Sequence, residues 1–192
     1  MAAGRARWPH PAGQRARKLT TTAGAAFQTQ GLRLVFHLLT NPEWLLLPNL
    51  NLAKRTRVPL QAATAALEDL EAQDFLKVGN GRQLTNIAGL VTRWVAGYSL
   101  ALRPNLPTQR YRWKAGIDAS NAWSSLARQT KTLWSGTMAA CRLLGTPLDV
   151  ANVTLYAPNS VAHTLLQRVG LEPYHGGPVE VLRLFAVPGV AS

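Results

Sequence analysis

The sequence predicts an α+β fold in two parts, a group of helices that ends in a β-hairpin and a smaller mixed α/β domain after it. In the first half, apolar residues recur at the three and four spacing of helices that pack one face on a core. Asn80-Gly81 separates two short runs with strand character there, which is a strong hairpin signal. In the second half, runs rich in β-branched and aromatic residues alternate with helical segments. We therefore divide the chain into residues 1–26, 27–103 and 108–192.

The first expected helix opens the second of these segments. Its apolar side chains are Leu32, Leu34, Val35, Phe36, Leu38 and Leu39. Asn41-Pro42 ends it, because proline lacks the backbone donor and disfavours a helical conformation at the residue before it.

A second, short helix is expected within residues 49–58. Its apolar side is formed by Leu50, Leu52 and Ala53. Three basic residues project from the other side: Lys54, Arg55 and Arg57.

The third helix is expected from Pro59 to Asp74, since proline is tolerated at a first helical position. Its packing face consists of Ala63, Ala66, Leu67 and Leu70. The outward residues are Gln61, Ala62, Thr64, Ala65 and Glu68. Gln61 and Thr64 lie near the start of the helix and are the polar candidates for contacts with base edges.

A hairpin follows, with strands in residues 75–78 and 82–84. Helix, short helix, turn, helix and hairpin in this order are typical of a winged helix-turn-helix, whose second turn-motif helix enters the major groove of DNA. The candidate DNA-binding residues are Lys54, Arg55, Arg57, Gln61, Thr64, Lys77, Asn80 and Arg82. Winged helices also serve as modules that bind only protein, and this alternative stays open.

The charge is unevenly distributed along the chain. The net charge is +12, yet residues 43–85 hold five basic and five acidic side chains. The excess comes from residues 1–42, with six basic and no acidic side chains, and from residues 86–192, with ten basic and four acidic ones. Such a basic protein is expected to bind polyanions in a salt-dependent way.

Residues 1–26 combine arginines with Ala, Gly, Pro and Thr and lack apolar periodicity, so we expect a disordered basic arm. This arm either adds affinity for DNA or is a solvated extension. A single cysteine, Cys141, excludes an intramolecular disulfide and a cysteine-rich zinc site, which favours a reducing, cytoplasmic setting. No apolar run reaches the roughly 18 residues of a membrane span, so no membrane partner is expected.

A further helix is expected after the hairpin, capped by Thr85 or Asn86. Its apolar residues are Ile87, Leu90, Val91, Trp94, Val95 and Tyr98, and a packing role is the simplest interpretation of them. Pro104 and Pro107 then interrupt the periodicity and mark the boundary of the next domain.

In the C-terminal domain we expect strands at residues 110–113, 153–157 and 179–187. Residues 122–144 are expected to be largely helical, with a break near Ser135-Gly136, and residues 160–169 to form a short helix ended by Gly170.

Catalytic chemistry has little support in this domain. Its carboxylates are Asp118, Asp149, Glu172 and Glu180, none close in sequence to another. A nuclease generally needs two or three carboxylates around a metal. His163 and His175 have no cysteine near them, which argues against zinc. We therefore expect no enzyme, no metal and no cofactor.

Seven segments together resemble the AbiEi-type antitoxins of type IV toxin–antitoxin systems. They are GLRLVFHLL, LAKRTRVPLQAATAALEDLEAQDFL, RWVAGYSLALRPNL, RYRW, LWSGTMAA, VTLYAP and VEVLRLF, in this order over residues 27–187. The LWSGTMAA segment departs from the family pattern, which has an acidic residue after the tryptophan–glycine motif.

The resemblance implies a DNA-binding regulator that represses its own promoter. It also implies a C-terminal antitoxin domain that counteracts a nucleotidyltransferase-like toxin, so duplex operator DNA and such a toxin are the expected partners. A nucleic-acid-processing enzyme targeted by a winged helix and a protein-binding winged-helix adaptor are the alternatives.

Overall fold

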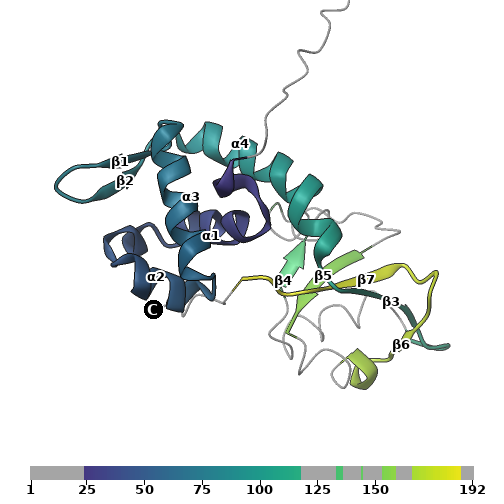
Figure 1. Cartoon of the computed structure of the whole chain (residues 1–192). Helices are drawn as coiled ribbons and strands as arrows, with labels where there is room; N and C mark the ends of the chain where they lie inside the picture. The colour runs from purple at the N-terminus through teal and green to yellow at the C-terminus, as the bar shows by residue number, and fades with distance from the viewer. Residues whose placement is uncertain (1–23, 118–132, 136–143, 145–152, 159–165, 187–192) are drawn as a thin grey trace, which may run out of the picture.

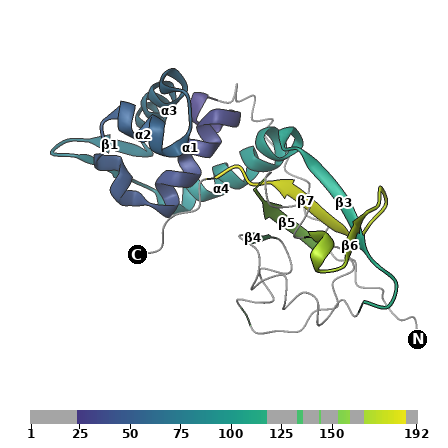
Figure 2. The ribbon, with the colours of Figure 1, turned by 90° about the horizontal axis from the view of Figure 1, so that it is seen from below.

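The computed structural model describes residues 24–117, 133–135, 144, 153–158 and 166–186. Helices and a hairpin lie on one side of the molecule and a β-sheet on the other, with helix α4 running between them (Figures 1 and 2). The expected α+β class is confirmed: helices come first and a mixed sheet follows. Most of the expected basic arm, residues 1–23, lies outside the described residues.

The helical elements follow the expected order. They are η1 (Ala25–Phe27), α1 (Thr29–Thr40), η2 (Pro42–Leu46), α2 (Asn49–Thr56), α3 (Leu60–Ala72), α4 (Ile87–Gly97), the π-helical turn η3 (Tyr98–Leu102) and η4 (Arg103–Asn105). Helix α1 ends before Asn41-Pro42 and α3 begins directly after Pro59, as the proline positions predict.

The packing faces of α1 and α3 are the expected ones, since Leu32 and Leu38 of α1 and Ala63 and Leu70 of α3 are fully buried. One residue of α2 was wrongly assigned. Leu50 is half-exposed, whereas the buried side of this short helix consists of Leu52, Ala53 and Thr56. In a helix of eight residues the sequence pattern is too short to fix which side faces the core.

Strands β1 (Leu76–Val78) and β2 (Arg82–Leu84) form the expected antiparallel hairpin, with Val78 paired to Arg82. The loop therefore has three residues rather than the two of an Asn-Gly turn. Gly81 alone of the Asn-Gly pair has a positive φ, of 152°. The hairpin projects from the helices (Figure 1), so the side chains of its tip face solvent.

Helix α4 starts as expected at Asn86, whose side chain accepts a hydrogen bond of 3.2 Å from the backbone N–H of Gly89. Its inward face is formed by Leu90, Trp94 and Tyr98, at successive intervals of four residues. Trp94 also donates from Nε1 to the carbonyl oxygen of Leu32, at 2.8 Å. This helix is thereby fixed on α1.

The sheet has the order β4-β5-β7-β3-β6. Its strands are β3 (Thr108–Trp113), β4 (Leu133–Ser135), β5 (Val153–Ala157), β6 (Leu171–Pro173) and β7 (Val179–Arg183). β5 and β7 are parallel and the other neighbours antiparallel. The three expected strands are present as β3, β5 and β7.

Strand β4 lies where the sequence predicted a largely helical segment, and this expectation was wrong for residues 133–135. The strand is held by pairing with β5, from Leu133 opposite Tyr156 to Ser135 opposite Thr154. Such pairing is a tertiary interaction that overrides a local preference. Strand β6 was not expected at all, while Gly170 before it has a φ of 88° and ends the preceding helix as predicted.

Alternation along β5 and β7 divides their side chains between two cores. Tyr156 and Leu182 belong to the core of the helices, whereas Leu155 and Val181 belong to a second core formed by the sheet itself. Phe185, just after β7, packs among Phe36, Trp94, Tyr98 and Tyr156. The sheet is thus joined to the helices through a continuous apolar cluster.

Candidate nucleic-acid interface

Asn49, the first residue of α2, connects three elements of the N-terminal part. Its Nδ2 donates to Thr64 Oγ1 of α3 at 3.3 Å, and its Oδ1 accepts from Arg82 Nη1 of β2 at 2.7 Å. Arg82 also donates from Nη2 to the carbonyl oxygen of Leu47. The start of α2, the first half of α3 and the hairpin therefore meet at one junction, which we call the Asn49 junction (Asn49, Thr64, Arg82).

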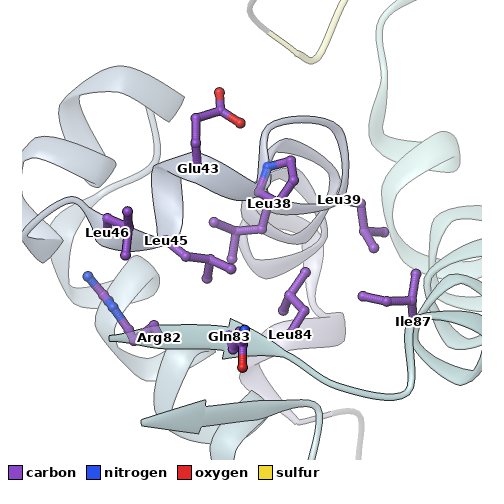
Figure 3. A pocket seen from close by; sticks show the side chains of 10 residues that line it. Leu38, Leu39, Glu43, Leu45, Leu46, Arg82, Gln83, Leu84 and Ile87 are labelled. Carbon is purple, nitrogen blue, oxygen red and sulfur yellow. The ribbon is translucent and has the colours of Figure 1, made fainter. Parts of the chain in front are cut away.

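A groove of about 460 Å³ runs beside this junction, between the hairpin and the end of α1. Apolar residues form most of its lining, among them Leu38, Leu45, Leu84 and Ile87. In Figure 3 the side chain of Arg82 extends from β2 along this groove toward Leu46. Burial lowers the pKa of Arg82 from its ordinary value. Arg82 thus holds the hairpin across a space that side chains do not fill.

Arg55 lies over an aromatic ring on the outer side of α2. Its guanidinium carbon is 4.5 Å from the ring centroid of Trp44, and Trp44 stacks on His37 at 5.5 Å between centroids. A guanidinium at this distance gains a cation–π interaction, so the direction of the Arg55 side chain is fixed by packing. Lys54 beside it is exposed.

His37 is fully buried under this stack. Burial, and after it the positive charge of nearby Arg33, together lower the pKa of His37 from 6.5 to about 4. The imidazole is therefore neutral at neutral pH.

Arg57 occupies the turn between α2 and α3. Its backbone is left-handed, with φ 56° and ψ 36°, and its N–H bonds to the carbonyl oxygens of Ala53 and Lys54. This is the geometry of a helix C-cap, which glycine usually provides. An arginine here combines the cap with an exposed charge at the turn.

The remaining candidates lie on α3 and the hairpin. Gln61 is exposed in the first turn of α3, and Thr64, one turn later, is half-buried at the Asn49 junction. Lys77 of β1 and Asn80 of the hairpin loop are exposed. The structure therefore brings Thr64 and Arg82 into one hydrogen-bonded group and leaves Gln61, Lys77 and Asn80 facing solvent.

The acidic residues of α3 lie in the second half of this helix. Asp69 accepts a hydrogen bond of 2.9 Å from the backbone N–H of Ala26, in η1. A side chain at Gly24 would collide with this carboxylate, since an added Cβ would lie 2.3 Å from its oxygens. Asp69 therefore holds η1 against the second half of α3, at the end of this helix that lies away from Gln61.

Two of the four carboxylates of the C-terminal part are described, and both contact arginine. Glu180 pairs with Arg103 at 2.6 Å and with Arg110 at 3.8 Å, and Glu172 pairs with Arg112 at 2.7 Å. Asp118, Asp149, His163 and Cys141 lie outside the described residues. Within the described part of the chain, no three His, Cys, Asp or Glu side chains gather in a way that could hold a metal ion.

Two residues of this region were missed by the sequence reasoning, Asn49 and Trp44. Asn49 follows Pro48 at a helix start, which is a signal for a side chain that bonds locally. Its actual partners, Thr64 and Arg82, are 15 and 33 residues away. No local pattern predicts such contacts.

The fold is that of an α+β protein in which a helical part with a hairpin carries a mixed sheet. Residues 83–188 match the family model described as transcriptional regulator, AbiEi antitoxin, type IV toxin–antitoxin system. The match spans more than half of the chain, and the protein belongs to this family. The resemblance inferred from the sequence is thereby confirmed. No curated protein and no solved structure matches the chain.

The matched region starts at the second strand of the hairpin, so α1, α2 and α3 lie before it. It includes α4 and the whole sheet. In the described residues, none of the helices has the length and apolar character that crossing a membrane requires.

Proposed function

We propose that the chain is a DNA-binding repressor of its own promoter and the antitoxin of a type IV toxin–antitoxin system. The observation that carries the DNA-binding part is the Asn49 junction, because it holds together the three elements that a winged helix-turn-helix applies to DNA. In this proposal residues 27–103 form the winged-helix domain and residues 108–192 the antitoxin domain. An operator as target implies the cytoplasm as the site of action.

The proposed docking places the first half of α3 in the major groove. Gln61 and Thr64 then approach base edges, and the exposed charges of Lys54, Arg57 and Lys77 approach phosphates on either side. The hairpin loop with Asn80 contacts the adjacent backbone. Arg55 and Arg82 contribute positive charge in fixed directions, since one lies over Trp44 and the other is bonded to Asn49 and Leu47.

The salt dependence of binding tests this docking. Lys54→Gln combined with Lys77→Gln should weaken binding to the operator and to unrelated duplex alike. The slope of log K against log salt should become shallower by about 1.8, since each lost phosphate contact contributes about 0.9. Fluorescence anisotropy with a duplex from the chain's own promoter measures this change.

A matched control removes the same charge elsewhere. Lys114→Gln combined with Arg168→Gln changes two exposed basic residues of the sheet part. We expect it to leave the slope within about 0.5 of the parent value, in keeping with a site outside the interface. Equal effects of both pairs would show that net charge, and not the docking face, determines binding.

Gln61 is the proposed reader of sequence, because a glutamine amide can make a bidentate contact with adenine. Gln61→Ala should reduce the free-energy preference for one base at one position of each binding site by about 1–3 kcal/mol. The affinity for unrelated DNA should stay nearly unchanged. Selection from a random duplex library compares the two proteins. Identical selected sites would contradict this role.

In the antitoxin part of the proposal, residues 108–192 counteract a nucleotidyltransferase-like toxin. The proposal includes no enzymatic step, and it is supported by the regulatory family and by the arginine partners of Glu172 and Glu180. Coexpression with such a toxin should restore growth. The Lys54→Gln, Lys77→Gln pair should retain this rescue and lose promoter repression, which separates the two activities.

A further inference from the structure

The side-chain amide of Asn49 can take only one orientation at the Asn49 junction. Arg82 has N–H donors and no acceptor, so the Asn49 atom that lies 2.7 Å from its Nη1 must be the carbonyl oxygen Oδ1. Arg82 is itself held in place, because its Nη2 donates to the carbonyl oxygen of Leu47. The amide NH₂ group of Asn49 is therefore the group that faces α3.

This orientation decides the role of the Thr64 hydroxyl group in the contact. Asn49 Nδ2 donates to Thr64 Oγ1 at 3.3 Å, and an amide NH₂ group is a donor only. Thr64 is consequently the acceptor. The hydrogen of its hydroxyl group stays available for a second partner.

The helix that carries Thr64 does not use this hydrogen. Three other helical threonines, Thr40, Thr56 and Thr92, each donate from Oγ1 to the carbonyl oxygen four residues before them, at 2.9, 2.8 and 2.9 Å. Among the described residues, the bond from Asn49 is the only hydrogen bond of the Thr64 side chain. Thr64 therefore has a free donor on the helix that the proposed docking places in the major groove.

The major-groove edges of guanine and cytosine differ in the groups that they offer to such a donor. Guanine has two acceptors, N7 and O6, whereas cytosine has only the N4 donor. A hydroxyl group without a fixed partner contacts either base, because it can donate or accept. Beside cytosine, however, the hydrogen of the Thr64 hydroxyl group would face a donor and lose its contact with water. A donor buried without an acceptor costs free energy.

We propose that Asn49, oriented by Arg82, makes the Thr64 hydroxyl group a donor that selects guanine over cytosine at one base pair of the operator. This inference rests on the proposed function, because it concerns DNA bound against α3. In it Thr64 contacts the base, and Asn49 is a positioning residue that acts through Thr64.

Selection from a random duplex library with the full chain tests this contact. The parent protein should favour guanine over cytosine about three- to tenfold at one position, the range of a single hydrogen bond. Thr64→Val preserves the shape of the side chain and should lose this preference, while the salt slope stays unchanged because no phosphate contact is lost. Thr92→Val is the matched control, since Thr92 bonds within α4, and it should select the same sites as the parent.

Asn49→Asp tests the positioning role. The new carboxylate accepts hydrogen bonds from both Arg82 and Thr64, so Thr64 Oγ1 faces the base as an acceptor. This variant should favour cytosine over guanine about three- to tenfold. Its added negative charge weakens binding to every duplex, so the readout is the ratio between the two bases. A merely structural role of Asn49 would lower all affinities and leave this ratio unchanged.

Circular dichroism and urea denaturation should show that both variants fold like the parent protein. Equal base preferences of the parent and Thr64→Val would overturn the inference, as would an Asn49→Asp variant that still favours guanine. In either case, a changed site for Gln61→Ala would leave the proposed docking intact. A parent protein that binds no duplex DNA would instead overturn the proposed function, and this inference with it.

Discussion

Arg57 has a left-handed backbone at the point where α2 ends, and its side chain is exposed. A residue with a Cβ is strained in this conformation by roughly 1–2 kcal/mol, and glycine is not. Glycine in turn loses more conformational entropy on folding. The two effects nearly cancel, so the choice of arginine at this position costs little stability.

Arg57→Gly should therefore leave the free energy of unfolding unchanged or raise it by up to about 1 kcal/mol. The same variant should weaken DNA binding and reduce the salt slope by about 0.9, because one phosphate contact is lost. Urea denaturation and anisotropy measure the two effects on one sample. A loss of stability together with a loss of binding would assign Arg57 a structural role only.

His37 links stability to pH. Its pKa is lowered from 6.5 to about 4 in the folded protein, so the unfolded chain takes up a proton first as the pH falls. The contribution of the neutral imidazole to stability is complete above pH 6.5 and is lost as the pH falls from there toward 4. The loss should reach about 3 kcal/mol, from about 1.4 kcal/mol for each unit of the shift.

The comparison with His37→Phe isolates this effect, since phenylalanine preserves an aromatic ring beside Trp44 and does not titrate. As the pH falls from 6.5 to 4, the free energy of unfolding of the variant should increase relative to that of the parent protein. His175→Gln is the control, because His175 is exposed. A pH-independent difference for His37→Phe would show that the buried imidazole is not the titrating group.

The hairpin is the element whose position depends most on a single side chain. Hydrogen bonds of Thr85 to Phe75 and Asp74 fix its base, at 2.9 Å for the backbone pair. Farther toward the tip, Arg82 spans the groove to Leu47 and Asn49 (Figure 3). A strand pair held so sparsely opens more readily than the packed helices.

Arg82→Met retains the apolar stem of the side chain and removes both hydrogen bonds of the guanidinium. Amide exchange at Val78 and at position 82 should become about tenfold faster, which corresponds to about 1.4 kcal/mol, while exchange in α1 stays unchanged. Lys77→Met on the neighbouring strand should not accelerate exchange, because Lys77 is exposed. Equal acceleration in both variants would rule out an anchoring role of Arg82.

At the scale of elements, sequence patterns succeeded where a helix or strand has one long apolar face or a clear stop signal. Helices α1 and α3, the cap of α4 and strands β3, β5 and β7 are of this kind. The sequence patterns failed for α2, because eight residues are too few to show whether Leu50 faces the core. They also failed for β4, because this strand forms through its pairing with β5. The sequence also did not show which apolar residues of α4 are buried: Leu90 is, whereas Ile87, Val91 and Val95 are exposed.

For the whole molecule, the cluster around Phe185 couples the sheet to the helices. Phe185 is 5.1 Å from Phe36 between ring centroids, and its carbonyl oxygen accepts a 3.1 Å hydrogen bond from Arg33 Nε. Nearby, the hydroxyl groups of Tyr98 and Tyr156 are hydrogen-bonded, and burial raises the pKa of Tyr98. We therefore expect the two parts to unfold in one transition.

Phe185→Ala should lower the free energy of unfolding by about 3–5 kcal/mol, since it removes a buried aromatic ring between the two parts. Tryptophan fluorescence and far-ultraviolet circular dichroism should report coincident urea transitions in the parent protein. Leu100→Ala, at a position with an exposed fraction of 82%, should change stability by less than about 0.5 kcal/mol. Separate transitions in the parent would show that the parts are energetically independent.

The sequence by itself determined the α+β class, the order of helices and hairpin, and the family resemblance that the family match confirms. These properties follow from local periodicity, proline positions and turn residues, which act over a few neighbours. The tertiary structure alone decided that Asn49 joins Thr64 to Arg82 and that Arg55 lies on Trp44. It also decided which face of α4 is buried, because contacts between residues far apart in the chain depend on how the elements pack.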